Sequence, residues 1–234
     1  MGSIPIIRSM VNNASTATRL EAFFYAGLLQ AVRQNFPRKG VIHIMRLLEK
    51  RILEDGCVIN NEVLNVDRIF SQQVDTGLLV EIGKEFESRF GNKNIDRILT
   101  VETAGIPIAM TTASYLHVPF VYARKQAIPI LEGSKLSIAA YSCSQSQHYH
   151  MYLLKHLLPE GERVLILDDI LSNGEAILGL IKMCRQAGAT VAGIGVAIEK
   201  TFRPGREKIR QEGYDVTALT RIERFEGGKP VFLR

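Results

Sequence analysis

The sequence predicts an α/β fold in which helices flank a central, mostly parallel sheet. Strand-like apolar segments alternate with segments of helical periodicity, which is typical of such a sheet. One strand is a nearly continuous apolar run, Val164-Leu165-Ile166-Leu167, as expected where helices cover both faces. Polar residues suited to chemistry follow the strands, at the edge where such sheets bind ligands. The 234 residues are 46% hydrophobic, enough to bury one sizeable core.

The regular pattern begins at Met45, after the breaker Pro37-Arg38-Lys39-Gly40. Asp75 is expected to cap a helix whose apolar residues recur at helical spacing, namely Leu78, Leu79, Ile82, Phe86 and Phe90. The predicted elements that follow are a strand at Arg97–Val101, a helix at residues 106–116, a strand at Phe120–Ala123, a strand at residues 163–167, a helix at residues 175–186 that Gly188 ends, and a strand at residues 191–198.

Residues 1–44 differ from the rest of the chain, because they mix Ser, Thr and Asn with isolated basic residues. We expect them to form a poorly ordered N-terminal extension, ahead of a domain at residues 45–234. Two alternatives remain open for this segment. One is a misplaced translation start, with the functional domain beginning at Met45, and the other is a helix at residues 20–34 that binds a partner.

Composition restricts the class of protein only loosely. The three cysteines, Cys57, Cys143 and Cys184, are widely spaced and predict reduced thiols, not disulfides or a zinc site. No apolar run approaches the roughly 18 residues that span a bilayer, and no signal peptide is recognised. We therefore expect a cytoplasmic protein without a membrane partner. The formal net charge of +5 suits a nucleic acid or a polyphosphate substrate equally well.

The segment after the third predicted strand combines groups suited to a phosphorylated sugar. Asp168 and Asp169 follow the strand, and Ser172-Asn173-Gly174 then leads into a helix. Backbone N–H groups at a helix N-terminus attract an anion, and glycine permits a close approach. Ionised carboxylates accept hydrogen bonds from sugar hydroxyls. An isolated Asp-Asp pair more often simply ends a strand, so these residue types alone leave an ordinary turn open.

Residues 164–176 as a whole resemble the motif with which type I phosphoribosyltransferases bind phosphoribosyl pyrophosphate (PRPP). Asn173 stands where that motif usually has a hydroxyl residue. From Gly56 to the C-terminus the chain is similar to bacterial xanthine phosphoribosyltransferases. The segments that match are Gly56-Cys57-Val58-Ile59, Val63-Leu64-Asn65-Val66-Asp67, Val101-Glu102-Thr103-Ala104-Gly105-Ile106, Ala123-Arg124-Lys125 and Ile198-Glu199-Lys200-Thr201-Phe202-Arg203-Pro204-Gly205-Arg206.

The resemblance implies the type I phosphoribosyltransferase fold, with a small hood from N- and C-terminal segments and a flexible lid loop. It implies transfer of the 5-phosphoribosyl group of PRPP to xanthine in purine salvage. The products would be XMP and pyrophosphate. Mg²⁺ would arrive with PRPP and not on metal ligands of the protein. A homodimer is the usual state of the family.

The resemblance also assigns site residues. The 5-phosphate would bind Ser172, Asn173, Gly174, Glu175 and Ala176, and the catalytic carboxylates Asp168 and Asp169 would hold the ribose hydroxyls. Pyrophosphate would meet Glu102, Thr103, Ala104, Gly105, Arg124 and Lys125. The base would contact Leu64, Ser71 and Lys200. An ammonium only donates hydrogen bonds, so Lys200 suits the carbonyl of a 6-oxopurine and not the amino group of adenine.

Residues 126–150 are polar, rich in serine and long for a passive connection, which predicts a lid over the site. Tyr141 and Ser142 are the expected lid contacts. His148 and His150 lie two residues apart, but the sequence places no third ligand near them. A solvated loop is therefore a better interpretation of this pair than a metal site.

Two other functions are compatible with the same motif. One is a hypoxanthine/guanine phosphoribosyltransferase, since both bases carry a 6-oxo group. The other is a non-catalytic, PRPP-sensing regulator of purine transcription on the same fold. Such a regulator needs a DNA-binding domain, and residues 1–44 lack the pattern of helices that one requires. We therefore do not expect nucleic acid as a partner. No G-x-G-x-x-G follows a predicted strand, which disfavours a dinucleotide-binding enzyme.

Overall fold

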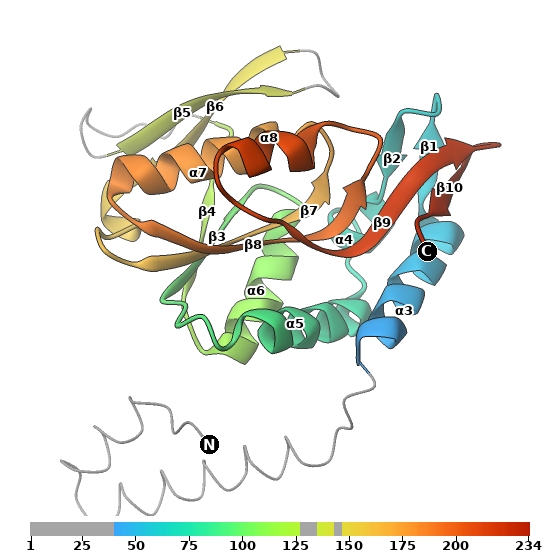
Figure 1. Cartoon of the computed structure of the whole chain (residues 1–234), viewed down its shortest axis with the longest axis horizontal. Coiled ribbons are helices and arrows are strands. Elements are labelled where there is room, and N and C mark those ends of the chain that lie inside the picture. The colour runs from blue at the N-terminus through green and yellow to red at the C-terminus, as the bar shows by residue number, and fades with distance from the viewer. Residues whose placement is uncertain (1–39, 127–134, 143–146) are drawn as a thin grey trace, which may run out of the picture. The chain divides into compact units, whose positions relative to one another are not determined.

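The computed structural model describes residues 40–126, 135–142 and 147–234 (Figure 1). Its elements are α3 (Gly40–Asp55), β1 (Cys57–Ile59), β2 (Val63–Asn65), α4 (Asp67–Phe70), α5 (Thr76–Phe90), β3 (Arg97–Val101), α6 (Gly105–Leu116), β4 (Phe120–Ala123), β5 (Lys135–Ser142), β6 (Gln147–Leu154), a 3₁₀ turn (Lys155–Leu157), β7 (Arg163–Leu171), α7 (Glu175–Ala187), β8 (Thr190–Lys200), α8 (Gly205–Gln211), β9 (Thr217–Glu226) and β10 (Lys229–Phe232).

A six-stranded sheet forms the centre of the domain, in the order β10-β9-β8-β7-β3-β4. All neighbouring strands are parallel except β10, which pairs antiparallel with β9 at one edge. Figure 1 shows α5 and α6 on one face of the sheet and α7 with α8 on the other. This arrangement confirms the predicted fold class. In the described part of the chain, no helix is long and apolar enough to cross a membrane.

Glycines on β8 let the helix α5 pack directly on the sheet. A Cβ atom added at Gly195 would lie 2.7 Å from the Phe86 ring, and one at Gly193 would lie 2.7 Å from the Phe90 ring. Both phenylalanines are buried in the core between α5, α6 and the sheet. The apolar spacing that predicts α5 therefore has its counterpart in the small residues of a strand more than a hundred positions away.

The predicted capping of the helices is confirmed. The Asp75 carboxylate accepts a hydrogen bond of 3.0 Å from the backbone N–H of Leu78 at the start of α5. Gly188 ends α7 in the left-handed conformation with φ of +77°. The first described helix, α3, begins at Gly40 and not at Met45, and Ile44 is buried in the core. Residues 1–39, the main part of the expected extension, lie outside the described residues.

Two predicted boundaries need correction. The third strand, predicted at residues 163–167, continues to Leu171 because its pairing with β8 extends to Leu171 opposite Glu199. Asp168 and Asp169 therefore lie within the strand. Residues 126–150, predicted as a loop, contribute to an antiparallel hairpin of β5 and β6. The lid contacts expected of the Tyr141 and Ser142 side chains, and a side-chain role for His148, lie outside the described residues.

The hairpin of β5 and β6 packs against α7 through an apolar face, although the segment as a whole is polar in composition. Leu136, Ala140, Met151 and Leu153 are buried in the cluster that contains the apolar side of α7. A Cβ atom added at Gly179 of α7 would lie 2.0 Å from the terminal methyl of Met151. Buried apolar residues alternate with more exposed residues along both strands, as expected for strands with one face against the core.

Segments from the two ends of the described chain form the expected hood. The hairpin of β1 and β2 turns at Asn60 and Asn61, both with positive φ, and lies beside β9 and β10 in Figure 1. The buried Glu49 of α3 accepts hydrogen bonds from Thr220 of β9 at 3.2 Å and from Arg234 at 3.3 Å. A polar contact therefore ties the first described helix to the last strands.

A buried ion pair holds the start of α8 to the end of β8. Glu199 is only 2% exposed, and its two carboxylate oxygens accept hydrogen bonds of 2.6 Å from Arg206. Arg221 donates a third bond of 2.9 Å. Burial alone would raise the pKa of Glu199, but the bonds and charges of Arg206 and Arg221 outweigh burial and lower the pKa. Gly205, the residue before Arg206, is thereby fixed in place.

We predict that Glu199→Gln lowers the stability of the fold by about 1–3 kcal/mol at neutral pH, since a buried charged bond is lost while Arg206 remains partly exposed to water. Because the pKa of Glu199 is lowered in the folded protein, this stabilisation is fully present at any pH above the ordinary pKa of glutamate. It is lost as the pH falls through the lowered pKa. Thermal unfolding of both proteins should therefore show a gap that narrows in acid. Glu223→Gln, at an exposed position, is the matched control.

Candidate active site

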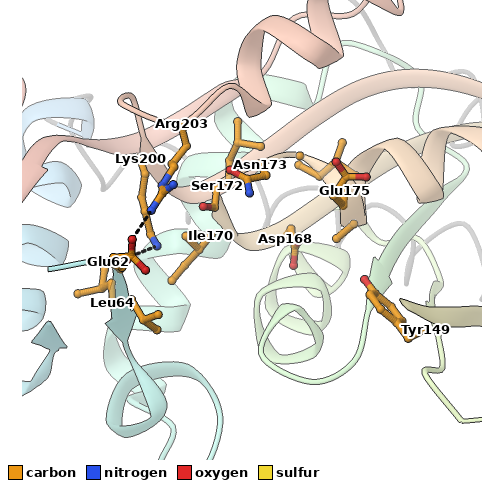
Figure 2. Close-up of a pocket in the computed structure, with 15 residues that line it drawn as sticks. Glu62, Leu64, Tyr149, Asp168, Ile170, Ser172, Asn173, Glu175, Lys200 and Arg203 are labelled. Atoms are coloured by element: carbon orange, nitrogen blue, oxygen red, sulfur yellow. Dashed lines mark hydrogen bonds and ion pairs between the residues drawn. The ribbon is translucent and has the colours of Figure 1, made fainter. Parts of the chain in front are cut away.

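A cavity of about 380 Å³ opens where β7 and β8 end (Figure 2). Its walls come from the hood, from the end of β7 with the loop after it, from the start of α7, from the end of β8 and from β6. Parallel sheets bind ligands at the carboxyl ends of their strands, so this cavity lies at the place that the fold favours. It contains acidic, basic and apolar side chains in separate regions.

The loop between β7 and α7 is the first region of the cavity. Gly174 begins α7 with φ of +84°, and its backbone packs against Gly205. A Cβ atom at Gly205 would lie 2.3 Å from the carbonyl oxygen of Ser172, which also accepts a 3.0 Å hydrogen bond from the Gly205 N–H. Two glycines therefore let two backbones touch. The N-terminus of α7, whose N–H groups and dipole favour an anion, faces the cavity beside Ser172 and Asn173.

Glu175 is the acidic residue in the first turn of α7, and its charge is paired. Its carboxylate lies 2.6 Å from the ammonium of Lys208 on α8. A free carboxylate at this position would oppose the binding of an anion. The ion pair with Lys208 reduces that opposition and links α7 to α8.

Asp168 lies at the floor of the cavity and is 5% exposed. Its carboxylate accepts a 3.0 Å hydrogen bond from the backbone N–H of Asp169. Burial, and next the neighbouring charge of Asp169, raise the pKa of Asp168 well above its usual range, while Lys125 opposes this rise. Burial, followed by the charges of Asp168 and Glu175, also raises the pKa of the Tyr149 phenol. The carboxylate of Asp168 can accept hydrogen bonds from the cavity, so this region suits a ligand that brings hydroxyl groups.

Lys200 stands at the other end of the cavity, 8% exposed. Its ammonium donates a 3.0 Å hydrogen bond to the backbone carbonyl of Glu62 in the hood and lies 5.7 Å from the centre of the Phe225 ring. Burial, and then the charge of Arg203, lower the pKa of Lys200. Figure 2 shows Lys200, Arg203 and Glu62 directed toward one another.

Apolar side chains line the space between these groups. Val63 and Leu64 come from the hood, and Ile170 and Leu171 come from the end of β7. A slot with apolar walls and hydrogen-bond donors at its end suits a flat heterocycle, because the ring faces are apolar and the edge is polar. The cavity thus has a region for an anion, a region for hydroxyl groups and a region for a heterocycle.

The structure brings about half of the predicted site residues into this one cavity. Those that line it are Leu64, Asp168, Ser172, Asn173, Gly174, Glu175, Ala176 and Lys200. Of the remaining predicted residues, all of them described, Asp169, Ser71, Glu102, Thr103, Ala104, Gly105, Arg124 and Lys125 lie outside its lining.

The predicted pyrophosphate residues lie beside the floor of the cavity. A Cβ atom at Gly105 would lie 2.1 Å from the Thr100 hydroxyl and 3.2 Å from Asp168. Glu102 accepts a hydrogen bond from the backbone N–H of Lys125. This bond therefore connects the predicted residues that follow β3 with those that follow β4. The ammonium of Lys125 lies 5.7 Å from the centre of the Tyr149 ring. Arg124 exchanges backbone hydrogen bonds of 2.8 Å with Tyr152 of the hairpin.

Ser71 follows α4 in the hood, where its hydroxyl donates a 2.7 Å hydrogen bond to Asp67. Asp67 in turn accepts a 2.9 Å bond from the Asn65 side-chain amide. The Ser71 side chain thus belongs to a polar network that holds the chain after β2. Its role as a contact of the base stays a prediction.

Several residues that line the cavity were missed by the sequence prediction, namely Glu62, Val63, Tyr149, Ile170, Leu171, Ile177 and Arg203. Tyr149 lay in the segment interpreted as a loop, although its aromatic character was visible. Arg203 lies three residues after Lys200, and that spacing past the end of a strand was an available signal. Glu62 sits in a hairpin turn, where only the tertiary structure places it opposite β8.

We predict that Asp168→Asn raises thermal stability at a pH well above the usual pKa of aspartate. The raised pKa of Asp168 means that its ionised form opposes folding above that pKa, and an amide removes the buried charge. The difference in melting temperature from the wild type should shrink as the pH falls and Asp168 takes up a proton. Asp215→Asn, at an exposed carboxylate, should change little. A loss of stability in Asp168→Asn at high pH would contradict the proposed cost of this charge.

The family model of the phosphoribosyl transferase domain matches residues 76–230. Solved structures with a similar fold include adenine phosphoribosyltransferase from Thermoanaerobacter pseudethanolicus, with a TM-score of 0.62 and 26% identity over 74% of this chain and 99% of that one. The enzyme from Giardia lamblia has a TM-score of 0.61 at 22% identity, over 71% and 93% of the two chains.

Curated relatives are more similar in sequence. The chain is 44% identical to a xanthine phosphoribosyltransferase of Latilactobacillus sakei subsp. sakei, over 81% of this chain and 97% of the relative. It is 42% identical to the protein of the same name from Clostridium botulinum, over 79% of this chain and 97% of the relative. Both alignments cover nearly the whole length of the relative.

Proposed function

Because this chain belongs to the phosphoribosyltransferase family, we propose that it transfers the 5-phosphoribosyl group of PRPP to xanthine, giving XMP and pyrophosphate. The main structural support is the division of one cavity between an anion-binding helix N-terminus and a buried, donor-only ammonium. The N-terminus of α7 suits the 5-phosphate, and Lys200 suits the 6-oxo group of a purine. The names of the similar full-length relatives support xanthine as the base.

The sugar phosphate is proposed to bind along β7 and its loop. The backbone of the loop, with Ser172, Asn173, Gly174, Glu175 and Ala176, would hold the 5-phosphate. The carboxylates of Asp168 and Asp169 would accept hydrogen bonds from the ribose hydroxyls. The position of the buried Asp168 in the lining of the cavity supports this role, since ribose hydroxyls can donate to its carboxylate.

The pyrophosphate is proposed to lie toward the loop after β3. There the backbone at Glu102, Thr103, Ala104 and Gly105 offers N–H groups, and Arg124 and Lys125 offer positive charge. The closeness of Gly105 to Asp168 supports this proposal, because it places the pyrophosphate loop next to the ribose site.

In the proposed reaction a nitrogen of the five-membered ring of xanthine bonds to C1 of the ribose while the bond from C1 to the pyrophosphate oxygen breaks. The pyrophosphate takes the electron pair of that bond, and the transition state has oxocarbenium character by analogy with glycosyl transfer. The proton that the five-membered ring carries is released to the departing pyrophosphate or to water. Lys200 would orient the base through its 6-oxo group, and Arg124 and Lys125 would stabilise the charge that develops on the leaving group. The apolar walls would exclude water from the reactive sugar.

Mg²⁺ is the proposed cofactor, bound through the phosphates of PRPP, where it would neutralise the charge of the leaving pyrophosphate. Among the described residues, no group of three or more His, Cys, Asp or Glu side chains is arranged to hold a metal ion. The adjacent carboxylates of Asp168 and Asp169 provide oxygen donors of the type that Mg²⁺ prefers, next to the proposed ribose site. These residues fit an ion that arrives with its substrate.

The oligomeric state, location and domain organisation of the protein are proposed from its family. We propose a homodimer, which the exposed Met110, Tyr115 and Tyr122 on α6 and β4 support as apolar surface that a partner can cover. We propose a cytoplasmic location, as expected for purine salvage. We also propose that the catalytic domain follows an N-terminal extension, with residues 40–44 belonging to the domain because α3 begins at Gly40.

The first test is an assay of nucleotide formation from PRPP and Mg²⁺ with xanthine, guanine, hypoxanthine and adenine in parallel. We expect the highest kcat/KM with xanthine and no turnover of adenine, whose 6-amino group cannot accept from Lys200. Lys200→Ala should lower kcat/KM for every 6-oxopurine by roughly tenfold to a hundredfold, the loss of one bond to a charged group. Turnover of none of the four bases, with PRPP still bound, would contradict an enzymatic function.

A second test addresses the contact between the two glycines. Gly205→Ala should raise the KM for PRPP by about tenfold or more, because its methyl group would displace the carbonyl of Ser172 and so the phosphate loop. Gly77→Ala is the matched control, since a Cβ atom there meets only the Asp75 side chain, at 3.6 Å. An unchanged KM in Gly205→Ala would show that the loop does not depend on this contact.

A further inference from the structure

Two cations, not one, occupy the end of the cavity that suits the base. Lys200 and Arg203 both line the cavity, and both contact Glu62 of the hood. The Lys200 ammonium donates to the Glu62 carbonyl at 3.0 Å, and the Arg203 guanidinium lies 3.9 Å from the Glu62 carboxylate. The charge of Arg203 also helps to lower the pKa of Lys200. Glu62 thus faces both cations, with its backbone carbonyl toward Lys200 and its carboxylate toward Arg203 (Figure 2).

These three groups can complement one edge of xanthine. The 6-oxo group accepts, the N1–H donates and the 2-oxo group accepts, in that sequence around the ring. The protein presents the complement, with Lys200 as donor, Glu62 as acceptor and Arg203 as donor. Hypoxanthine has no substituent at position 2. Guanine has an amino group there, and two donors facing each other repel.

Ser71, the hood residue that the resemblance assigns to the base, is engaged elsewhere. Its hydroxyl donates to Asp67 at 2.7 Å, and it lies outside the described lining of the cavity. The base end of the cavity therefore takes its second polar side chain from the segment after β8 and not from the position of Ser71. Arg203 is partly buried, which strengthens a charged hydrogen bond relative to one in water.

We propose that Arg203 determines the choice of base by donating a hydrogen bond to the 2-oxo group of xanthine, with Glu62 accepting from N1–H between Arg203 and Lys200. This assignment rests on the proposed function. An arginine at this place binds an oxo group and rejects an amino group, because guanidinium has donors and no acceptor. A site built around such a bond also discriminates against a base that lacks the group, since the buried donor is then left without a partner.

The test compares kcat/KM for xanthine and hypoxanthine in the wild type and in Arg203→Met. Methionine keeps an unbranched side chain and removes every donor. We expect kcat/KM for xanthine to fall at least about tenfold, as for the loss of one bond to a charged group, and that for hypoxanthine to stay within about twofold. Arg203→Lys should recover part of the preference for xanthine. For guanine, kcat/KM of Arg203→Met should equal or exceed that of the wild type.

Hypoxanthine is the internal control, because a variant with a damaged fold or a damaged PRPP site loses activity with both bases. Arg210→Met, which makes the same change at an exposed position of α8, should leave the ratio of the two bases unchanged. An equal fall for xanthine and hypoxanthine in Arg203→Met, or no change for either, would overturn the role of Arg203. A wild-type protein that does not use xanthine would instead refute the proposed function itself.

Discussion

The parallel pairing of β7 with β8 is the interaction on which the rest of the site depends. Its register places Asp168 opposite Val196 and Leu171 opposite Glu199, so both strands end at the same cavity. The loop after β7 and the segment after β8 then meet through backbone contacts at Gly174 and Gly205, where a side chain on either residue would force them apart. The buried Glu199, held by Arg206 and Arg221, keeps that second segment in place. One pair of strands thus brings the N-terminus of α7 and the cations Lys200 and Arg203 to one cavity.

The cavity has been built at a cost in stability. Asp168 and Lys200 are both buried. Burial raises the pKa of Asp168 and lowers the pKa of Lys200, so in each case it favours the neutral form. For each residue, the effect of burial outweighs the effect of the opposite charges nearby. A ligand that brings hydroxyl groups to Asp168 and an oxo group to Lys200 would add hydrogen bonds to both charged groups. Binding energy is then available from groups that folding has already desolvated, which is the usual advantage of a pre-organised site.

Two small hairpins complete the cavity from outside the main sheet. The hood hairpin brings Glu62 to Lys200 across more than a hundred residues of sequence, and the hairpin of β5 and β6 brings Tyr149 near Asp168. Both hairpins are anchored, one by its place beside the C-terminal strands and the other by Met151 against Gly179 of α7. The cavity is therefore lined both by the ends of strands of the main sheet and by residues of two added hairpins.

The sequence by itself determined the strands and helices around the sheet, because hydrophobic periodicity and capping residues such as Asp75 and Gly188 act over a few neighbouring positions. It also singled out the motif from Asp168 to Ala176 and Lys200, since these lie at or near the carboxyl ends of predicted strands. It could not give the hairpin of β5 and β6, whose buried face is formed only against α7, or the extension of β7 past residue 167, which the partner strand imposes. Only the tertiary structure brought Glu62 and Arg203 together with Lys200 and left Ser71 bonded to Asp67. Contacts between segments far apart in the chain have no local pattern, so they are decided when those segments pack.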